Sequence, residues 1–148
     1  MTADHVGRRP ETERGQGLVE FALVALFLLL TMFAIVDFAR VFFGYATMAN
    51  GVREGARYAI VNPDDKAEIV AAAEAKMLVL GASVDVTVTF PMIDTNGDPY
   101  LDLGGQPCND DNRGSRCPVL VTASSDFSVW TPIVPSFTMA ASATMHIE

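Results

Sequence analysis

One acidic residue, Glu20, stands at the start of a long apolar stretch in this 148-residue chain. The sixteen residues 21–36 carry no charge, and Thr31 is their only polar member. A bilayer core about 30 Å thick is spanned by about 20 mostly apolar helical residues, so we predict a transmembrane helix over about residues 18–36. A carboxylate within such a helix is costly unless it is paired, which makes Glu20 a candidate functional residue. The alternative is that Glu20 is solvated at the membrane surface, where a charge costs less.

Two cysteines, Cys108 and Cys117, lie close together in a polar segment and are the only cysteines in the chain. Beyond a membrane helix the compartment is oxidising, so this spacing favours a disulfide that closes a small loop. Metal binding is the alternative in a cytosolic protein, but a structural zinc ion requires four ligands. We therefore predict a structural disulfide and no metal site.

The acidic segment 94–102 offers oxygen ligands at alternate positions, as in the first half of a calcium-binding loop. However, Pro99 stands where such a loop has its invariant glycine, and Gly105 stands where it has a bidentate glutamate. A solvated turn rich in Asp, Asn and Gly explains the composition as well. No cofactor is therefore predicted.

Catalytic patterns are scarce in this sequence. Its two histidines are His5 and His146, and His146 is expected on the exposed face of the last strand. No phosphate loop, nucleophile elbow or metal-ligand spacing is present, so we predict no enzyme activity. The net charge of −8 argues against a nucleic-acid partner, which favours a basic surface.

The apolar stretch is expected to continue outside the membrane as one helix to about Ile60. Asp37 and Arg40 are three residues apart and can form an ion pair near the membrane interface. Gly51 and Gly55 form a small-residue pattern that permits close packing. The apolar positions at helical spacing are Tyr45, Met48, Ala49, Val52, Ala56 and Ala59.

A second, short amphipathic helix is predicted after residue 61. Asn62 is the expected N-cap and Pro63 the first helical residue, while Gly81 is the expected stop. The predicted apolar stripe consists of Ile69, Val70, Ala73, Met77 and Leu80.

Three stretches alternate between apolar and polar residues, as half-buried strands do. They cover residues 84–90, 119–124 and 137–147, and the segment 130–135, with two prolines, joins the last two. An antiparallel three-stranded sheet with one face on the helices is the simplest closure. The predicted class is therefore α+β, and no internal repeat is apparent.

The N-terminal strings RGQGLVEFALV (residues 14–24) and IVDFAR (residues 35–40) resemble the TadE-like family. Members are minor pilins or pseudopilins of the Flp/Tad tight-adherence pilus, with a type IV prepilin-like N-terminus. The resemblance implies a pilin-like fold, a long helix followed by a small antiparallel sheet.

The same resemblance implies that a prepilin peptidase cuts between Gly15 and Gln16, with Glu20 and Phe21 serving processing and assembly. Glycine lacks the β-carbon that would obstruct a peptidase, although Gly15 and Gly17 alternatively only loosen the chain. The family's proposed partner for Glu20 is the new α-amino group of a neighbouring subunit. The implied partners are the peptidase, other pilins of the same system and membrane lipid.

The expected organisation is a cytoplasmic leader (1–15), a long helix (16–60) and an extracytoplasmic α+β domain (61–148). Arg8, Arg9 and Arg14 favour a cytoplasmic N-terminus, but the other flank also carries arginines, so charge alone leaves the orientation open. The cleavage signal and the cysteine pair indicate an external C-terminal part, so we predict a single-pass cell-membrane protein. An uncleaved signal-anchored domain that binds a ligand or ion is the alternative; a conventional signal peptide has a shorter apolar region.

Overall fold

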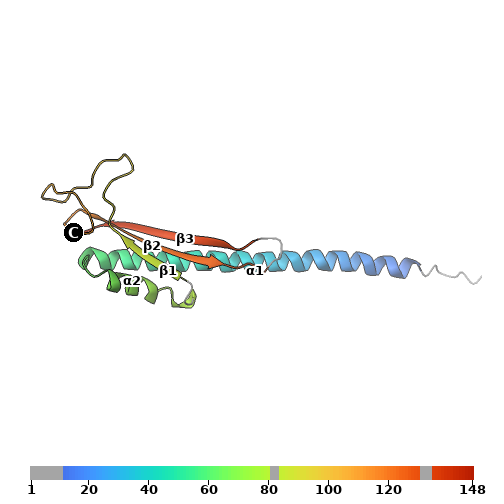
Figure 1. The fold of residues 1–148 in the computed structure, drawn as a ribbon. Coiled ribbons are helices and arrows are strands. Elements are labelled where there is room, and N and C mark those ends of the chain that lie inside the picture. Colours follow the sequence, from blue (N-terminus) through green and yellow to red (C-terminus); the bar gives the residue numbers. More distant parts are fainter. Residues whose placement is uncertain (1–11, 81–83, 131–134) are drawn as a thin grey trace, which may run out of the picture.

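The chain forms one long helix with a small sheet and a second helix packed along its C-terminal half (Figure 1). A computed structural model describes residues 12–80, 84–130 and 135–148. The helices are α1 (Thr12–Val61), α2 (Lys66–Ala75) and the 3-10 turn η1 (Leu78–Leu80). The strands are β1 (Val84–Thr89), β2 (Pro118–Phe127) and β3 (Phe137–His146). The predicted α+β class, with one long apolar helix, one short helix and a three-stranded sheet, is confirmed.

The sheet has the order β1-β2-β3, and both pairings are antiparallel. The register places Val86 opposite Ala123 and Ala123 opposite Ala141, so one row of small apolar residues crosses the sheet. Side chains alternate between the two faces of a strand, and this row therefore belongs to the inner face. All three residues are buried.

The inner face of the sheet packs against α1, and α2 closes the side of α1 next to β1 (Figure 1). The core contains Met48, Val52, Ala56 and Ala59 of α1, with Ile69 and Ala73 of α2. These α1 positions recur every three or four residues, which is the spacing of one helix face. Tyr45, which we expected on this face, is 52% exposed. That prediction was wrong. Gly44, which lies against Met139 of β3 and Leu80 of η1, and the buried Met48 are the residues of this part of α1 that face the folded part.

Gly51 and Gly55 let α1 approach its neighbours closely. A β-carbon at Gly55 would lie 2.9 Å from the Ala73 β-carbon and 3.2 Å from the Ile69 carbonyl oxygen. A β-carbon at Gly51 would lie 2.6 Å from the Met77 side chain. The small-residue pattern therefore serves packing within this chain, between α1 and the α2 region.

The first turn of α2 differs from the prediction. Asp65 is the N-cap, and its Oδ1 accepts a hydrogen bond from the Glu68 backbone N–H at 3.1 Å. Asn62 instead donates its backbone N–H to the Tyr58 carbonyl, which completes the last turn of α1. Asn62 therefore ends one helix rather than starting the next, and Pro63 lies in the turn between them. The predicted stop at Gly81 lies outside the described residues.

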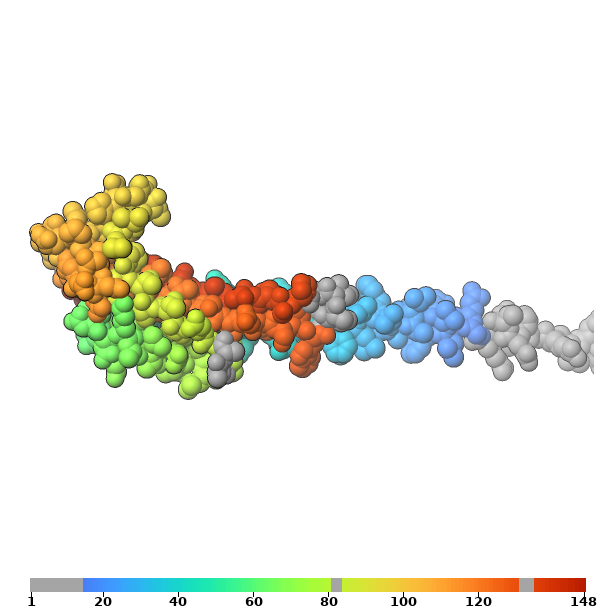
Figure 2. All heavy atoms as spheres, viewed as in Figure 1, coloured from blue at the N-terminus to red at the C-terminus, as the bar shows by residue number. Residues whose placement is uncertain are grey.

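The long helix begins at Thr12, earlier than the expected start at residue 16, and ends at Val61. Among the described residues, it is the one helix long and apolar enough to cross a membrane. In the part of the chain that the structure describes, no other element packs on its N-terminal half, which projects from the folded part (Figure 2). The helix thus has a bare half and a packed half.

We expect Gly55→Ala to destabilise the folded part. Overpacking costs about 1–3 kcal/mol, whereas the better helix propensity of alanine returns about 1 kcal/mol, so a net loss of about 1 kcal/mol is expected. Thermal unfolding of the full-length chain in detergent, followed by circular dichroism, measures this loss as a lower Tm. Gly44→Ala is the matched control, because its β-carbon would meet mainly the flexible end of Met139 at 3.2 Å. Equal Tm values for the two variants would contradict the close-approach explanation.

Candidate functional site

The bare half of α1 presents large apolar side chains on every side. Leu18 is 71% exposed and Phe21 is 73% exposed. Gly15, Gln16 and Glu20 share one face of the helix with Val19, Leu23 and Val24. A helix that is apolar all round is stable only in lipid or against other helices. This surface is therefore built to be covered by something outside the chain.

The bond between Gly15 and Gln16 lies within the first turns of α1. The space around Gly15 and Gly17 is open, with no atom within 4 Å of a β-carbon built at either position. Each glycine weakens a helix by about 1 kcal/mol relative to alanine. The two glycines therefore lower the helix propensity at this end of α1.

Asp37 and Arg40 lie where the bare half of α1 meets the packed half. Asp37 is 4% exposed, and its Oδ1 lies 3.5 Å from Arg40 Nη1. The same Oδ1 accepts a hydrogen bond from the Trp130 backbone N–H at 3.2 Å. The Asp37 carboxylate therefore joins α1 to the connection that follows β2.

The aromatic partners of Arg40 are the last residue of β2 and a residue of the connection that follows it. The Arg40 guanidinium carbon lies 5.1 Å from the ring centroid of Phe127 and 4.6 Å from that of Trp130. Cations over aromatic faces are attracted by the ring quadrupole. We call Asp37, Arg40, Phe127 and Trp130 the Asp37 cluster. Sequence analysis missed Phe127 and Trp130, since nothing in the sequence links residues 93 positions apart.

A disulfide joins Cys108 and Cys117, which are nine residues apart and fully buried, at the end of the molecule far from Thr12. The disulfide prediction is confirmed. Closing a loop of this size contributes about 2–3 kcal/mol in the chain-entropy view.

The disulfide loop is tied to the helices through Phe90. Arg113 lies 4.6 Å from the centroid of this ring and Lys66 lies 5.3 Å from it. Arg113 Nη1 also donates to the Pro63 carbonyl oxygen at 3.0 Å, and Lys66 Nζ donates to Asp110 Oδ1 at 2.9 Å. These contacts hold the loop against the turn between α1 and α2.

Residues 93–100 and 101–108 form two copies of one eight-residue turn. Both have an apolar residue, then Asp, with Gly at the fifth position and Pro at the seventh. Gly97 and Gly105 have φ values of 90° and 75°, which favour glycine. The antiparallel bridges Ile93–Pro99 and Leu101–Pro107 close the two copies identically. The expectation of no internal repeat was therefore wrong. The repeat was missed because each copy is only eight residues long.

The aspartates of this repeat accept hydrogen bonds from their own turns. Asp94 Oδ1 accepts from the backbone N–H groups of Asn96 and Asp98, at 2.8 and 2.9 Å. Asp102 Oδ1 accepts from Gly104 and Gln106, both at 2.8 Å. These bonds explain the Asp, Asn and Gly of the segment by turn formation. No group of three or more acidic, His or Cys side chains suited to a metal occurs in residues 12–80, 84–130 and 135–148.

Hydrogen bonding lowers the pKa of both carboxyl groups below the ordinary value. For Asp94 the main cause is the Asp98 N–H, followed by the Asn96 N–H. For Asp102 the main cause is the Gln106 N–H, followed by the side-chain amide of Asn112. Asn112 Nδ2 donates to Asp102 Oδ2 at 3.1 Å, which ties the second turn to the disulfide loop.

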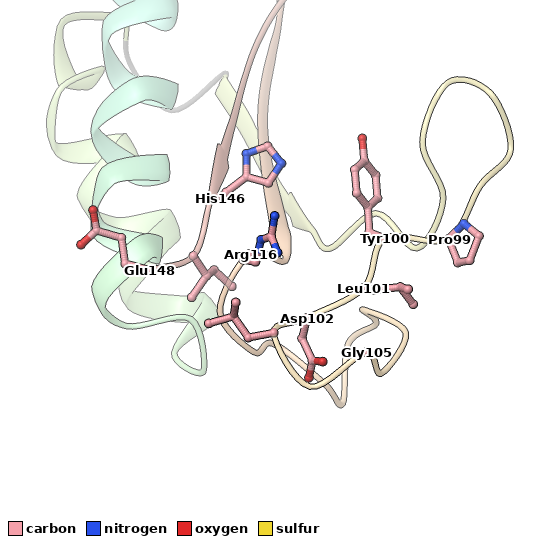
Figure 3. A pocket seen from close by; sticks show the side chains of 10 residues that line it. Pro99, Tyr100, Leu101, Asp102, Gly105, Arg116, His146 and Glu148 are labelled. Carbon is pink, nitrogen blue, oxygen red and sulfur yellow. The ribbon is translucent and has the colours of Figure 1, made fainter.

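An open groove of about 850 Å³ runs between this repeat and the ends of the strands (Figure 3). Tyr100, Arg116 and His146 supply most of its hydrogen-bonding side chains. The His146 side chain is exposed, and its ring lies 6.3 Å from the Tyr100 ring in an edge-on arrangement. Arg116 has a φ of 76°, unusual for a residue with a β-carbon, and its N–H donates to the Ile147 carbonyl at 2.7 Å.

Comparison with known proteins gives one match. Residues 15–57 match the sequence model of a family described as TadE-like protein. The match covers the bare half of α1, the Asp37–Arg40 pair and most of the packed half, and it confirms the family resemblance found in residues 14–24 and 35–40. No curated protein matches the chain, and no solved structure does.

We expect Asp102→Asn to remove part of the acid sensitivity of the folded part. A carboxyl group whose pKa is lower in the folded state stabilises it above the unfolded value of about 3.9, and this contribution is lost as the pH falls. The asparagine keeps an oxygen that accepts from the Gly104 and Gln106 N–H groups, but its own NH2 group faces the side-chain amide of Asn112. Its Tm should be below wild type at pH 7, and the difference should shrink as the pH falls below about 3.9. Asp102→Ala, which also loses the acceptor oxygen, should stay below Asp102→Asn, and a gap between wild type and Asp102→Asn independent of pH would contradict the assignment.

Proposed function

We propose that the chain is a minor pilin or pilus-assembly protein of a Flp/Tad pilus, because residues 15–57 match the TadE-like family. In this proposal a prepilin peptidase removes the leader after Gly15, and the mature α1 packs beside the helices of other pilins. The role is structural rather than enzymatic. The observation that carries the proposal is the bare half of α1, which matches the family where its apolar surface is exposed.

The geometry of the first turns supports a role for Glu20 in assembly. Cleavage after Gly15 gives Gln16 a cationic α-amino group with a reference pKa near about 8. Gln16 and Glu20 lie on one exposed face, one helical turn apart. If a neighbouring helix covers this face, its α-amino group can come within reach of Glu20, or its carboxylate within reach of the Gln16 α-amino group. Pairing would then offset the cost of placing Glu20 in an apolar setting.

The buried disulfide and the single membrane helix support an orientation for the chain. Disulfides persist in oxidising compartments, so the Cys108–Cys117 disulfide supports a folded part outside the cytoplasm. We propose a cytoplasmic leader (1–15), α1 crossing the membrane over about residues 18–36, and an extracytoplasmic part from residue 61 onward. From there the protein primes, caps or stabilises an adhesive pilus, or assists its assembly at the membrane.

The groove beside Tyr100 favours one alternative, an uncleaved signal-anchored domain that binds a ligand outside the membrane. The groove is open (Figure 3), and the segment 99–105 that lines it lies at the end of the molecule far from Thr12 (Figure 1). The two functions differ in the mature N-terminus, since the alternative requires an intact leader.

Processing is tested by the mass and N-terminal sequence of the membrane-extracted protein. We expect a chain that begins at Gln16 and a full-length chain when Gly15 is replaced by alanine. Gly17→Ala is the matched control, because both glycines have equally open surroundings. Should the two glycines only loosen the helix, both variants would be processed alike, and an untrimmed wild-type chain would overturn the proposed cleavage.

The assembly role is tested with Glu20→Gln, which removes the charge but keeps the size. Leaving one charge of a buried pair unpartnered costs about 3–5 kcal/mol. We therefore expect normal cleavage but a loss of co-purification with partner pilins and of surface pili. Glu20→Asp keeps the charge and should retain part of both. Normal pili in cells that carry Glu20→Gln would refute this role.

A further inference from the structure

Several large apolar side chains are exposed near the junction of the two halves of α1, and five of them belong to three separate segments. They come from α1, from η1 and from the connection after β2, and we call them the junction surface: Phe42, Phe43, Leu78, Val79 and Trp130. Leu78 and Val79 are each 76% exposed and Trp130 is 66% exposed. Exposed apolar side chains gathered from separate segments indicate an interaction surface.

The contacts of Trp130 and Val79 show beside which residues of α1 each of them lies. Trp130 is held at Asp37 by its backbone hydrogen bond and by the Arg40 guanidinium over its ring. Val79 lines a shared groove with Phe43 and Gly44. The connection after β2 and η1 therefore reach α1 within about two helical turns of each other. Both contacts lie between Asp37 and the part of α1 that packs on the sheet.

The rise per residue of an α-helix converts these positions along α1 into depths relative to the bilayer. Residues 18–36 span about 28 Å along α1, close to the bilayer's hydrocarbon thickness of about 30 Å. Asp37 and Trp130 then lie at the edge of the hydrocarbon, and Phe43 and Val79 lie about 9 Å farther out, at or just beyond the outer limit of a headgroup layer about 5–8 Å thick on each side. Tryptophan is enriched at this interface because its ring is apolar and its N–H is polar.

We propose that the junction surface docks onto the bilayer, with Trp130 among the lipid headgroups and Val79 near their outer limit. Lipid is the occupant because the surface is continuous with the lipid-exposed side of α1 and no spacer separates them. Arg40 fits the same setting, since its charged group can lie among headgroup phosphates while its stem stays on apolar surface. The inference requires α1 to cross a membrane, but it does not depend on cleavage after Gly15 or on pilus assembly.

The chain carries its own probe for this proposal, because Trp130 is its only tryptophan. The full-length protein is reconstituted into phosphatidylcholine–phosphatidylglycerol vesicles in which some lipids carry bromine at a shallow or a deep acyl position. We expect blue-shifted emission and a loss of more than half of it with shallow bromine, with a smaller loss for deep bromine. Leu78→Ser/Val79→Ser should reduce the shallow quenching and shift the emission to the red.

Two control proteins carry the tryptophan elsewhere, in a Trp130→Phe background. Phe27→Trp, in the bare half of α1, should be quenched best by deep bromine. Thr144→Trp, on the exposed face of β3, should emit as in water.

Two results would overturn the proposal. If Phe27→Trp is quenched while Trp130 emits as in water, α1 spans the bilayer but the junction surface stays clear of it. If Trp130 emission is blue-shifted but unquenched, and reverts when the protein is diluted in lipid, a second copy of the chain covers the surface instead.

Discussion

The structure depends on α1 serving two environments without a break. Over residues 18–36 its apolar side chains point in every direction, as suits a helix surrounded by lipid or by other helices. From Gly44 to Ala59 one face is buried, and that face forms a wall of the core. Among the described residues the sheet packs on α1 and α2, and α2 packs on α1, so the folded part is assembled along the packed half of α1.

The transition between the two environments is marked by polar chemistry. Asp37 is a buried carboxylate at the point where the apolar run ends, and it holds both Arg40 and the Trp130 backbone. A buried charge is tolerated when it is paired and hydrogen-bonded. This carboxylate binds the connection after β2 to α1. The folded part therefore extends along α1 as far as the end of the apolar run. The distal end is held by different means, a disulfide and the cations around Phe90.

The parts of the fold that follow from local periodicity could be predicted from the sequence. Val84, Val86 and Val88 alternate with polar residues, and β1 forms where that pattern lies. The α2 cap was misassigned because Asn62 and Asp65 are both good N-caps, and only the three-dimensional course of the chain decides which residue ends α1. The disulfide followed from cysteine spacing and compartment.

The candidate site was only partly accessible to such reasoning. Gly15, Gln16, Glu20 and Phe21 are local in sequence, and their pattern was recognisable; their roles stay predictions. The contact between Asp37 and Trp130 joins residues 93 positions apart, and no periodicity encodes it. The repeated Asp-x-x-Gly-x-Pro turn was visible in principle, but its aspartates were first considered as calcium ligands because that motif also places oxygen atoms at alternate positions.

The central claim is that α1 passes unbroken from the membrane into the core, so that the folded part has one position relative to the bilayer. Spin labels at Leu28→Cys and Ser142→Cys test it directly, because the native cysteines are joined in a disulfide and do not react. Pulsed electron paramagnetic resonance on the full-length protein in lipid nanodiscs should give a single narrow distance distribution. A broad or bimodal distribution would show a hinge between the two halves of α1 and would contradict the account.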